Sequence, residues 1–440
     1  MIANILFLIL LIAGSALFTI NVRKVIRNIN LGKDIDRKDN PSKRLSSMIK
    51  VALGQSKMVV RPVAGILHII VYAGFIIINI EVIEIIIDGI FGTHRVLSFM
   101  GPLYNFLIAS FEFLGFGVAA ACAIFLVRRN IIKIKRFWSK EITSWPRTDA
   151  NLILCTEIAL MTAFLTMNAA DYLLQQQHYE HYISVGSFPI SSSLIAPLLS
   201  GFSLPTLEMI ERICWWFHII GIVSFLNYLP YSKHFHIILA FPNVYFSNLN
   251  NKGKFTNMEA VTKEVKLMLD PNANPYAAAD PNAAPVHNKF GAKDVTDLTW
   301  KQLMDAYSCT ECGRCTSNCP ANITGKLLSP RKIMMDTRDR LEEVGKGIDK
   351  NGKDFQDGKS LLGDYILAEE LWACTSCNAC VEACPVNIDP LSLIVDLRRF
   401  LVMEQSAAPQ ELNMVFNNIE NNGAPWQFAQ ANRLKWTEEN

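Results

Sequence analysis

The chain has 440 residues, of which half are hydrophobic and 19% are charged, and its mean hydropathy is positive at +0.21. These values are unusual for a soluble protein and typical of one that lies partly in lipid. The net charge is +2, so no overall basic field points to a nucleic acid partner. Eight of the eleven cysteines lie between positions 309 and 384 in two matched groups, which indicates metal sites and not a disulfide scaffold.

Five apolar stretches have the roughly 20 residues that a membrane-spanning helix needs: 3–22, 62–87, 102–127, 150–173 and 209–240. The first is followed, not preceded, by basic residues, which favours a retained anchor over a secretory signal. Eleven Lys and Arg lie between Asn21 and Arg61 and seven between Arg128 and Asp149, but none from Tyr172 to Glu208. This asymmetry predicts a multi-pass protein of the cytoplasmic (inner) membrane, with its N-terminus outside and all residues after about 241 in the cytoplasm.

Histidines lie at lipid depth on the second and fifth spans, where polar residues are functional candidates. His68 lies near the inner start of span two, and span five carries His218, His234 and His236. On a continuous helix, His218 and His236 share one face roughly 27 Å apart, and His234 points to nearly the opposite face. His68 and His236 both lie toward the cytoplasmic face, so they predict the axial ligands of an inner b-type haem. The alternative is that each histidine packs between helices.

His218 predicts a ligand of a second, outer haem, but its partner is not evident. The equivalent depth on span two is near Ile86, which cannot coordinate iron. His94 is the nearest candidate, if the Asp-Gly and Phe-Gly breaks before it turn the chain back inward. His178 and His181 are weaker candidates and are better explained as solvated loop residues.

The motif H-x-x-G…P-Y-S-K-x-x-H in span five resembles the corresponding helix of the respiratory nitrate reductase gamma subunit. Related cytochrome b subunits of membrane heterodisulfide reductases and of sulfite-reduction complexes share it. The resemblance implies that His218 binds an outer haem and His236 an inner haem, with His68 as the inner partner. The second histidine that this family has on span two is absent, because the chain reads IIINIE there.

Residues 271–285 read PNANPYAAADPNAAP, a low-complexity stretch that predicts an extended tether. The segment that follows ends in WKQLMDAYSC, and Asp294 or Thr296 is expected to cap a short helix that leads to Cys309.

Two Cys-x-x-Cys-x-x-Cys-x-x-x-Cys-Pro runs then follow, each typical of [4Fe–4S] ligation, in which the fourth cysteine generally binds the other cluster. We therefore expect one cluster on Cys309, Cys312, Cys315 and Cys384, and a second on Cys374, Cys377, Cys380 and Cys319. The competing interpretation is a pair of structural zinc sites. Tetrahedral zinc leaves no use for the third cysteine and the Cys-Pro of each run.

The apolar spacing around both runs is helical, which favours an α-helical ferredoxin domain. The core C-T-E-C-G-R-C resembles the C subunit of heterodisulfide reductase and similar domains of glycolate oxidase and glycerol-3-phosphate dehydrogenase. The tail FNNIENNGAPWQFAQANRLKW is similar to that family too, and in fused relatives it precedes a catalytic module with Cys-Cys-Gly motifs. No cysteine follows it here, so a separate Cys-Cys-Gly-type subunit, resembling the heterodisulfide reductase B subunit, or another soluble redox protein is the expected partner.

The sequence thus predicts an all-α protein, with a five-helix, haem-binding transmembrane bundle followed by a cytoplasmic α-helical dicluster ferredoxin domain. The expected boundaries are 1–245 for the cytochrome b-like domain, 246–292 for a linker, 293–405 for the ferredoxin domain and 406–440 for a partner-binding tail. Its expected function is to pass electrons between a soluble partner and quinone through two [4Fe–4S] clusters and one or two haems b. The alternative is a membrane anchor or assembly scaffold, with structural or sensory clusters and no haem.

Overall fold

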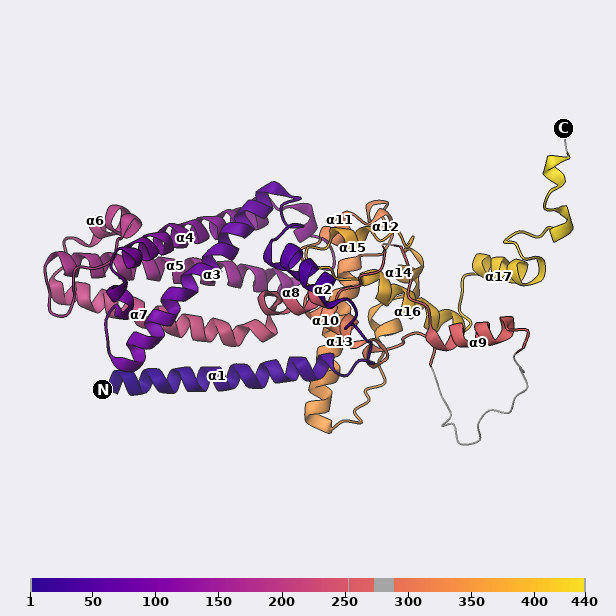
Figure 1. Ribbon diagram of the computed structural model, residues 1–440, viewed down its shortest axis with the longest axis horizontal. Helices are drawn as coiled ribbons and strands as arrows, with labels where there is room; N and C mark the ends of the chain where they lie inside the picture. The colour runs from indigo at the N-terminus through magenta and orange to yellow at the C-terminus, as the bar shows by residue number, and fades with distance from the viewer. Residues whose placement is uncertain (1, 252, 273–288, 439–440) are drawn as a thin grey trace.

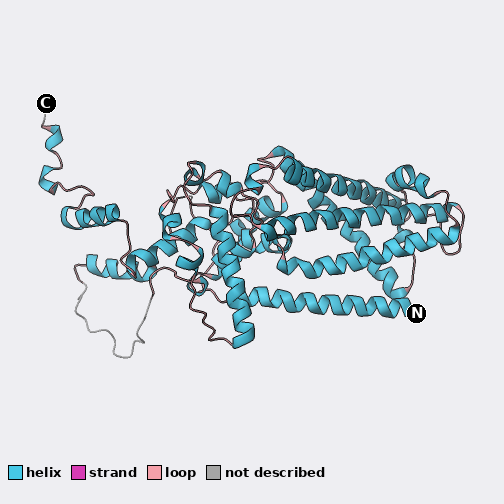
Figure 2. Ribbon diagram, turned by 180° about the vertical axis from the view of Figure 1, so that it is seen from behind, coloured by secondary structure: helices cyan, strands magenta, loops and turns pink. Residues whose placement is uncertain are grey.

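A computed structural model describes residues 2–251, 253–272 and 289–438. These residues form helices and loops. The described residues contain two isolated β-bridges, Lys33–Thr299 and Leu362–Ile366, but no β-strand. Figure 1 shows an elongated molecule with long parallel helices at one end and a compact group of short helices at the other. Figure 2 shows the same arrangement from behind, with helices throughout. The all-α prediction is confirmed for the described residues.

Five helices are long and apolar enough to cross a membrane: α1 (Ile2–Ile29), α3 (Pro62–Phe91), α4 (Pro102–Leu126), α5 (Ser144–Gln176) and α7 (Leu204–Tyr228). Most residues in their apolar windows face outward, which suits lipid because a helix satisfies its own backbone hydrogen bonds there. The prediction of five spans is confirmed in that five described helices have the required length and apolar composition. The short helices α2 (Pro41–Met48), α6 (Ala196–Leu199) and α8 (His236–Tyr245) complete this part.

The end of α3 differs from the prediction. The helix continues through Asp88 and Gly89 and stops at Gly92, whose φ of +73° is one that glycine adopts readily. The Asp88 carboxylate then accepts the backbone N–H of Arg95 at 2.8 Å and that of Val96 at 3.2 Å. The chain therefore turns at the far end of the bundle, and the Asp-Gly pair does not fold it back inward.

The fifth span is not one continuous helix to residue 240. α7 ends at Tyr228, two short 3₁₀ turns follow (Leu229–Tyr231 and Lys233–Phe235), and Ser232 between them is extended, with ψ 151°. Pro230 lacks the N–H that a continuing helix needs. Asp149 on α5 accepts the Ser232 hydroxyl at 2.7 Å and the Lys233 N–H at 3.3 Å. The predicted five-turn spacing of His218 and His236 is therefore wrong, because the helix breaks between them.

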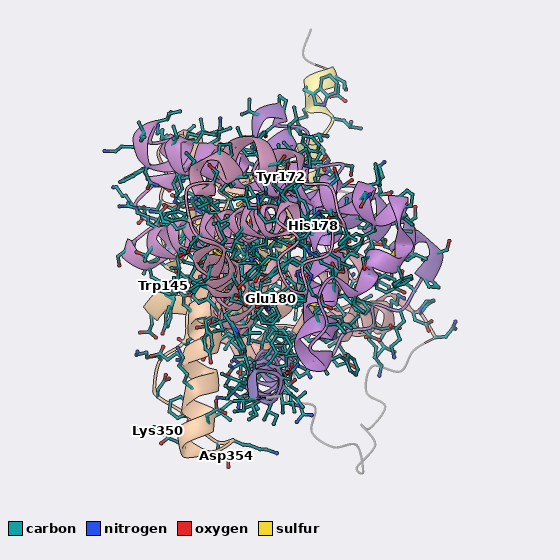
Figure 3. All side chains as sticks on the ribbon, turned by 90° about the vertical axis from the view of Figure 1, so that its left-hand side faces the viewer. Trp145, Tyr172, His178, Glu180, Lys350 and Asp354 are labelled. Carbon is teal, nitrogen blue, oxygen red and sulfur yellow. The ribbon has the colours of Figure 1, made fainter. Side chains whose placement is uncertain are left out.

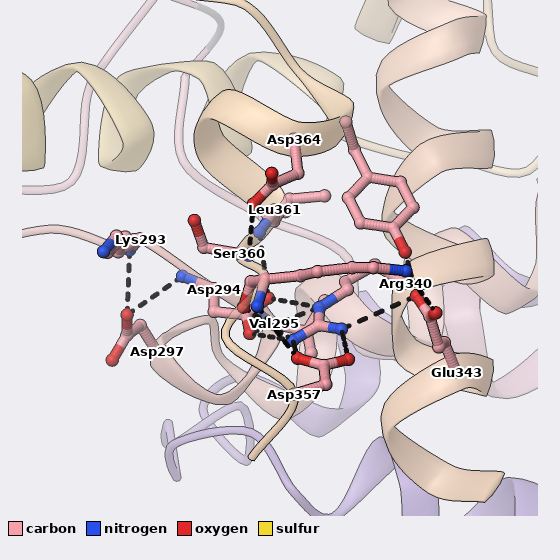
Figure 4. A network of polar contacts seen from close by, with 12 residues as sticks. Lys293, Asp294, Val295, Asp297, Arg340, Glu343, Asp357, Ser360, Leu361 and Asp364 are labelled. Carbon is pink, nitrogen blue, oxygen red and sulfur yellow. Dashed lines mark hydrogen bonds and ion pairs between the residues drawn. The ribbon is translucent and has the colours of Figure 1, made fainter. Parts of the chain in front are cut away.

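The cluster domain consists of short helices around one long one. Its elements are α10 (Trp300–Tyr307), α11 (Arg314–Ser317), α12 (Pro320–Ile323), α13 (Pro330–Asn351), α14 (Ala368–Trp372), α15 (Ala379–Ala383) and α16 (Pro390–Met403). Arg340 on α13 donates to Asp294 at 2.8 Å and to Asp357 at 2.5 Å, and Figure 4 shows this guanidinium joining the segments on either side of it. The domain is thereby closed by an ion-pair network as well as by its core.

The cluster domain packs directly on one end of the bundle of long helices. One apolar core runs from Val25 and Ile29 of α1 through Leu239 of α8 to Leu303 and Ile333 of the cluster domain. A buried hydrogen bond of 2.9 Å joins Asn28 to the Tyr307 hydroxyl. The two parts therefore form one packed unit.

The predicted linker 246–292 and tail 406–440 contain helices of their own. α9 (Glu259–Leu269) lies within the first, and the rest of the expected tether, residues 273–288, lies outside the described residues. α17 (Gln410–Asn422) lies in the tail, which Figure 1 shows extending away from the cluster domain.

Candidate iron–sulfur and haem sites

The first cysteine loop is held by the caps of the helices on both sides of it. Thr299 and Gln302 form a capping box at the start of α10, which leads into Cys309; the expected caps Asp294 and Thr296 do not start this helix. Asp294 caps the preceding 3₁₀ turn instead. Gly313 has φ +69°, and a Cβ there would lie 2.5 Å from Nη1 of Arg331, so glycine lets the loop pass close to α13.

The two cysteine runs surround two separate cavities. Cys309, Cys312, Cys315 and Cys384 line the first. Cys319, Cys374, Cys377 and Cys380 line the second. Each cavity thus receives three cysteines from one run and the fourth from the other, which is the grouping that the crossed [4Fe–4S] pattern predicts.

Four of the eight cysteines are buried, namely Cys309, Cys319, Cys380 and Cys384, and some of the eight accept backbone hydrogen bonds. Burial raises the pKa of Cys309 to about 11 and that of Cys384 to about 12. These thiols are therefore protonated without metal, and iron must displace their protons. The backbone N–H of Ile388 donates to Cys384 Sγ at 3.3 Å, and that of Ser376 donates to Cys374 Sγ at 3.4 Å. Hydrogen bonds of this kind raise the reduction potential of a thiolate-bound cluster.

The zinc interpretation does not fit this arrangement. The cysteines surround a space instead of a point, as a four-iron cube requires.

Charged residues inside the first run connect it to the membrane part. Glu311 accepts from Arg338 at 2.8 Å and pairs with Lys233, which lies in the break between α7 and α8. Burial raises the pKa of Glu311, but the charges of Arg338 and Lys233 outweigh it and hold that pKa below its ordinary value. Arg314 donates to the backbone carbonyls of Lys57 at 2.9 Å and Met58 at 3.2 Å, just before α3.

Sequence reasoning missed these four residues, Lys233, Glu311, Arg314 and Arg338. Only Glu311 and Arg314 could have been noticed from sequence, because they lie between metal-binding cysteines and a buried charge there needs an oppositely charged or hydrogen-bonding partner.

Three histidines lie together where the cluster domain meets the bundle. His68 lies near His236 and Arg314, and the ring centroids of His234 and His236 are 5.6 Å apart. The prediction that His234 points away from His236 is therefore wrong, because the 3₁₀ turns replace the helix on which it rested. His236 donates from Nδ1 to the Lys233 carbonyl at 3.0 Å, and Nδ1 of His68 is buried without a partner.

The two candidates for an outer haem do not meet. His218 is buried in the middle of α7, and its Nδ1 donates to the Leu160 carbonyl at 3.1 Å. His94 lies 3.6 Å from Asp171 and beside the ring of His181. Leu160 and Asp171 are 11 residues apart on α5, which is roughly 16 Å along a helix axis. The structure does not support the pairing of His94 with His218, because two axial ligands must face one iron. His178, the remaining loop candidate, is exposed.

The fold and the cysteine pattern define a class: the chain is a membrane-anchored iron–sulfur electron-transfer protein with two [4Fe–4S] clusters. Residues 308–388 match the family described as 4Fe-4S dicluster domain.

Three curated proteins show what the chain resembles. It is 31% identical to the probable iron-sulfur-binding oxidoreductase FadF of Bacillus subtilis, over the whole chain and 61% of that protein. It is 28% identical to the EtfAB:quinone oxidoreductase of Syntrophomonas wolfei, over 92% of the chain and 55% of that protein. A C subunit of a Methanosarcina acetivorans CoB-CoM heterodisulfide reductase is 33% identical over 27% of the chain and 60% of its own length.

The chain therefore spans less than two thirds of the length of these relatives. No solved structure matches it.

Proposed function

We propose that this chain carries electrons between a soluble redox partner and membrane quinone, through its two clusters and a b-type haem held by His68 and His236. One observation carries the proposal. The loop around the first cluster cavity contacts both segments that bear these histidines, through Glu311 with Lys233 and through Arg314 with Met58.

The proposed cluster ligands are the two groups of four that line the cavities. The clusters supply one-electron redox chemistry, and the chain's task is to hold them at fixed separation and to set their potentials. The buried Arg314 and the N–H donors to Cys374 and Cys384 favour the reduced, more negative clusters.

The residues at the inner end of the bundle fit a haem. A metal-bound histidine usually donates its other ring nitrogen to a carbonyl, and His236 does so to Lys233, which leaves its Nε2 free. His68 on α3 lies near His236, and a buried ring nitrogen without a partner suits a residue whose function needs a ligand. When bound, a haem supplies a one-electron carrier between the clusters and the lipid-facing part of the bundle.

The remaining parts of the proposal rest on charge and on the relatives. The Lys/Arg asymmetry supports a cluster domain in the cytoplasm and an N-terminus outside. A quinone substrate, either menaquinone or ubiquinone, is supported by the similarity to the EtfAB:quinone oxidoreductase of Syntrophomonas wolfei. The proposed partner is a soluble redox protein, for example a Cys-Cys-Gly-type subunit that docks on the tail 406–440.

A reduced-minus-oxidised visible spectrum of the purified chain tests the haem. We expect a b-type α-band that His68→Ala and His236→Ala each abolish, with iron and sulfide from the clusters unchanged. His234→Ala tests which member of the adjacent pair binds, and we expect it to keep the band. His178→Ala, on an exposed loop, is the matched control. A wild-type protein with both clusters and no α-band would favour the scaffold alternative.

A further inference from the structure

The end of the bundle away from the clusters contains buried charges that electron transfer alone does not need. Five carboxyl groups there are at most 2% exposed, from α3, α4, α5 and α7: Glu81, Glu84, Glu112, Asp171 and Glu211. The cations near them are Arg95, which is buried, and Arg212, which is partly exposed. Because an unpaired buried carboxylate is unfavourable, some of these acids must hold protons.

Arg95 organises the group. Its guanidinium lies 2.8 Å from Asp171, donates to Asn168 at 2.7 Å, and reaches Glu81 Oε1 only at 3.4 Å. Asp171 is therefore the well-paired carboxylate, and Glu81 shares the guanidinium at longer range. Glu84 has other partners, the Leu97 N–H at 2.9 Å and the Tyr104 hydroxyl at 3.0 Å.

Glu81 is the least satisfied of these acids. Its Oε2 is buried and has no hydrogen-bond partner. The charged groups that act on it are Arg95 from the loop after α3, Glu84 on its own helix and Glu112 on α4. Glu112 is itself held by Asn168 and by the backbone N–H groups of Ile190 and Ser191. An orphaned carboxyl oxygen next to two further acids is suited to binding a proton and releasing it.

A series of exchangeable groups leads from the surface to Asp171, which shares the Arg95 guanidinium with Glu81. Asp171 Oδ1 lies 3.6 Å from His94 Nε2, and the His94 ring lies 5.4 Å from the ring of His181, which is exposed. Nδ1 of His94 is also buried without a partner. Figure 3 looks at this end and shows the loop with the labelled His178 and Glu180 over the middle of the bundle. The route from water to Asp171 thus runs through two imidazoles.

We propose that Glu81 exchanges protons with a quinone headgroup in the bundle, and that these protons come from the side of the membrane away from the clusters, through His181, His94 and Asp171. This inference rests on the proposed electron transfer to quinone. A water carries the proton past Arg95, because a guanidinium does not deprotonate.

In this reaction one quinone takes up two electrons and two protons and becomes one quinol. An O–H bond forms at each carbonyl oxygen. The electrons come from the clusters, which a reduced soluble partner or dithionite reduces.

The test uses the full chain in liposomes with the cluster domain outward, embedded menaquinone and a trapped pH dye. Dithionite added outside reduces the clusters, and protein-free liposomes correct for direct reduction of quinone. We expect quinone reduction to make the lumen alkaline by two protons per quinone. Glu81→Gln and His94→Asn should each slow both signals at least tenfold, with cluster iron unchanged. Glu180→Gln, an exposed carboxylate at the same end, should not.

Infrared difference spectra provide a second measurement that does not depend on turnover. We expect a protonated-carboxyl C=O band that shifts in D₂O and disappears in Glu81→Gln. Quinone reduction at the wild-type rate in Glu81→Gln, or with no change of lumen pH, would overturn this inference alone. Failure of the wild-type protein to reduce quinone would overturn the proposed function and this inference with it.

Discussion

Cys384 shows how single residues set the arrangement of the clusters. It belongs to the second run, yet it lines the cavity of the first together with Cys309, 75 positions earlier in the chain. Cys319 makes the opposite crossing into the second cavity. The crossing ties both runs together, so that neither cluster forms from one segment alone.

We expect Cys384→Ser to remove the first cluster and Cys319→Ser to remove the second. Because each cube holds four irons, iron content should fall from about eight to about four per chain in either variant. Paired electron paramagnetic resonance spectra should show that Cys384→Ser and Cys312→Ser lose the same signal. If Cys384→Ser instead lost the signal of the second cluster, to which Cys377 belongs, the crossed assignment would be wrong. Ser317→Ala, which changes a residue inside the first run that is not a cysteine, is the control.

At the same scale, Lys233 links the first cluster loop to the proposed haem ligand His236. Its backbone carbonyl orients His236, and its side chain pairs with Glu311 between two cluster cysteines. The cysteines could be predicted from sequence because their spacing is diagnostic of [4Fe–4S] ligation. Lys233 could not, because its role depends on a partner 78 residues away.

We expect Lys233→Met to lower the midpoint potential of the first cluster by tens of millivolts. Removing a nearby positive charge disfavours reduction, and the effect is on the order of 1 kcal/mol at an effective dielectric constant of about 20. Redox titration followed by electron paramagnetic resonance measures it. Lys346→Met, on the exposed side of α13, should leave the potential unchanged. An unaltered potential in Lys233→Met would show that the ion pair is structural only.

Among the elements, the contact between the end of α1 and the start of α10 fixes the cluster domain on the bundle. Lys33 exchanges two backbone hydrogen bonds with this segment, accepting from Trp300 at 3.0 Å and donating to Leu298 at 2.7 Å. A Cβ on Gly32 would lie 2.6 Å from the backbone nitrogen of Trp300. Glycine therefore permits an approach that no larger residue allows.

We expect Gly32→Ala to destabilise this junction by about 1–3 kcal/mol, because the backbone of the facing segment must move. The temperature at which the cluster absorbance bleaches should fall by several degrees. Gly201→Ala is the control, since no atom lies within 4 Å of the added methyl group. Equal bleaching temperatures for the two variants would show that the junction tolerates the shift.

Element types were more predictable than element ends. Apolar length was enough to locate five spans, because a bilayer imposes it. The break after Tyr228 could not be predicted from apolar length, since it depends on Asp149 accepting the hydroxyl of Ser232 and the N–H of Lys233 across the bundle. The position of His94 was missed for the same reason, because Asp88 and Asp171 hold that turn at the bundle's end.

Figure 1 shows the cluster domain and the bundle of long helices along one axis. Three regions of the molecule enter the proposals: the cluster cavities, the histidines where the two parts meet, and the polar group at the far end of the bundle. Sequence patterns predicted the first region and part of the second. The third could not be predicted, because Glu81, Arg95 and Asp171 lie on different elements and meet only in the folded bundle.

Reoxidation of dithionite-reduced protein by a soluble quinone, followed at the iron–sulfur absorbance in a stopped-flow instrument, tests the central claim most directly. Electron transfer from the clusters through the site of His68 and His236 predicts rapid reoxidation in the wild-type protein. It also predicts at least a hundredfold slower reoxidation in His68→Ala, with both clusters intact. Reoxidation of His68→Ala at the wild-type rate would contradict the claim, since electrons would then reach quinone without passing through the bundle.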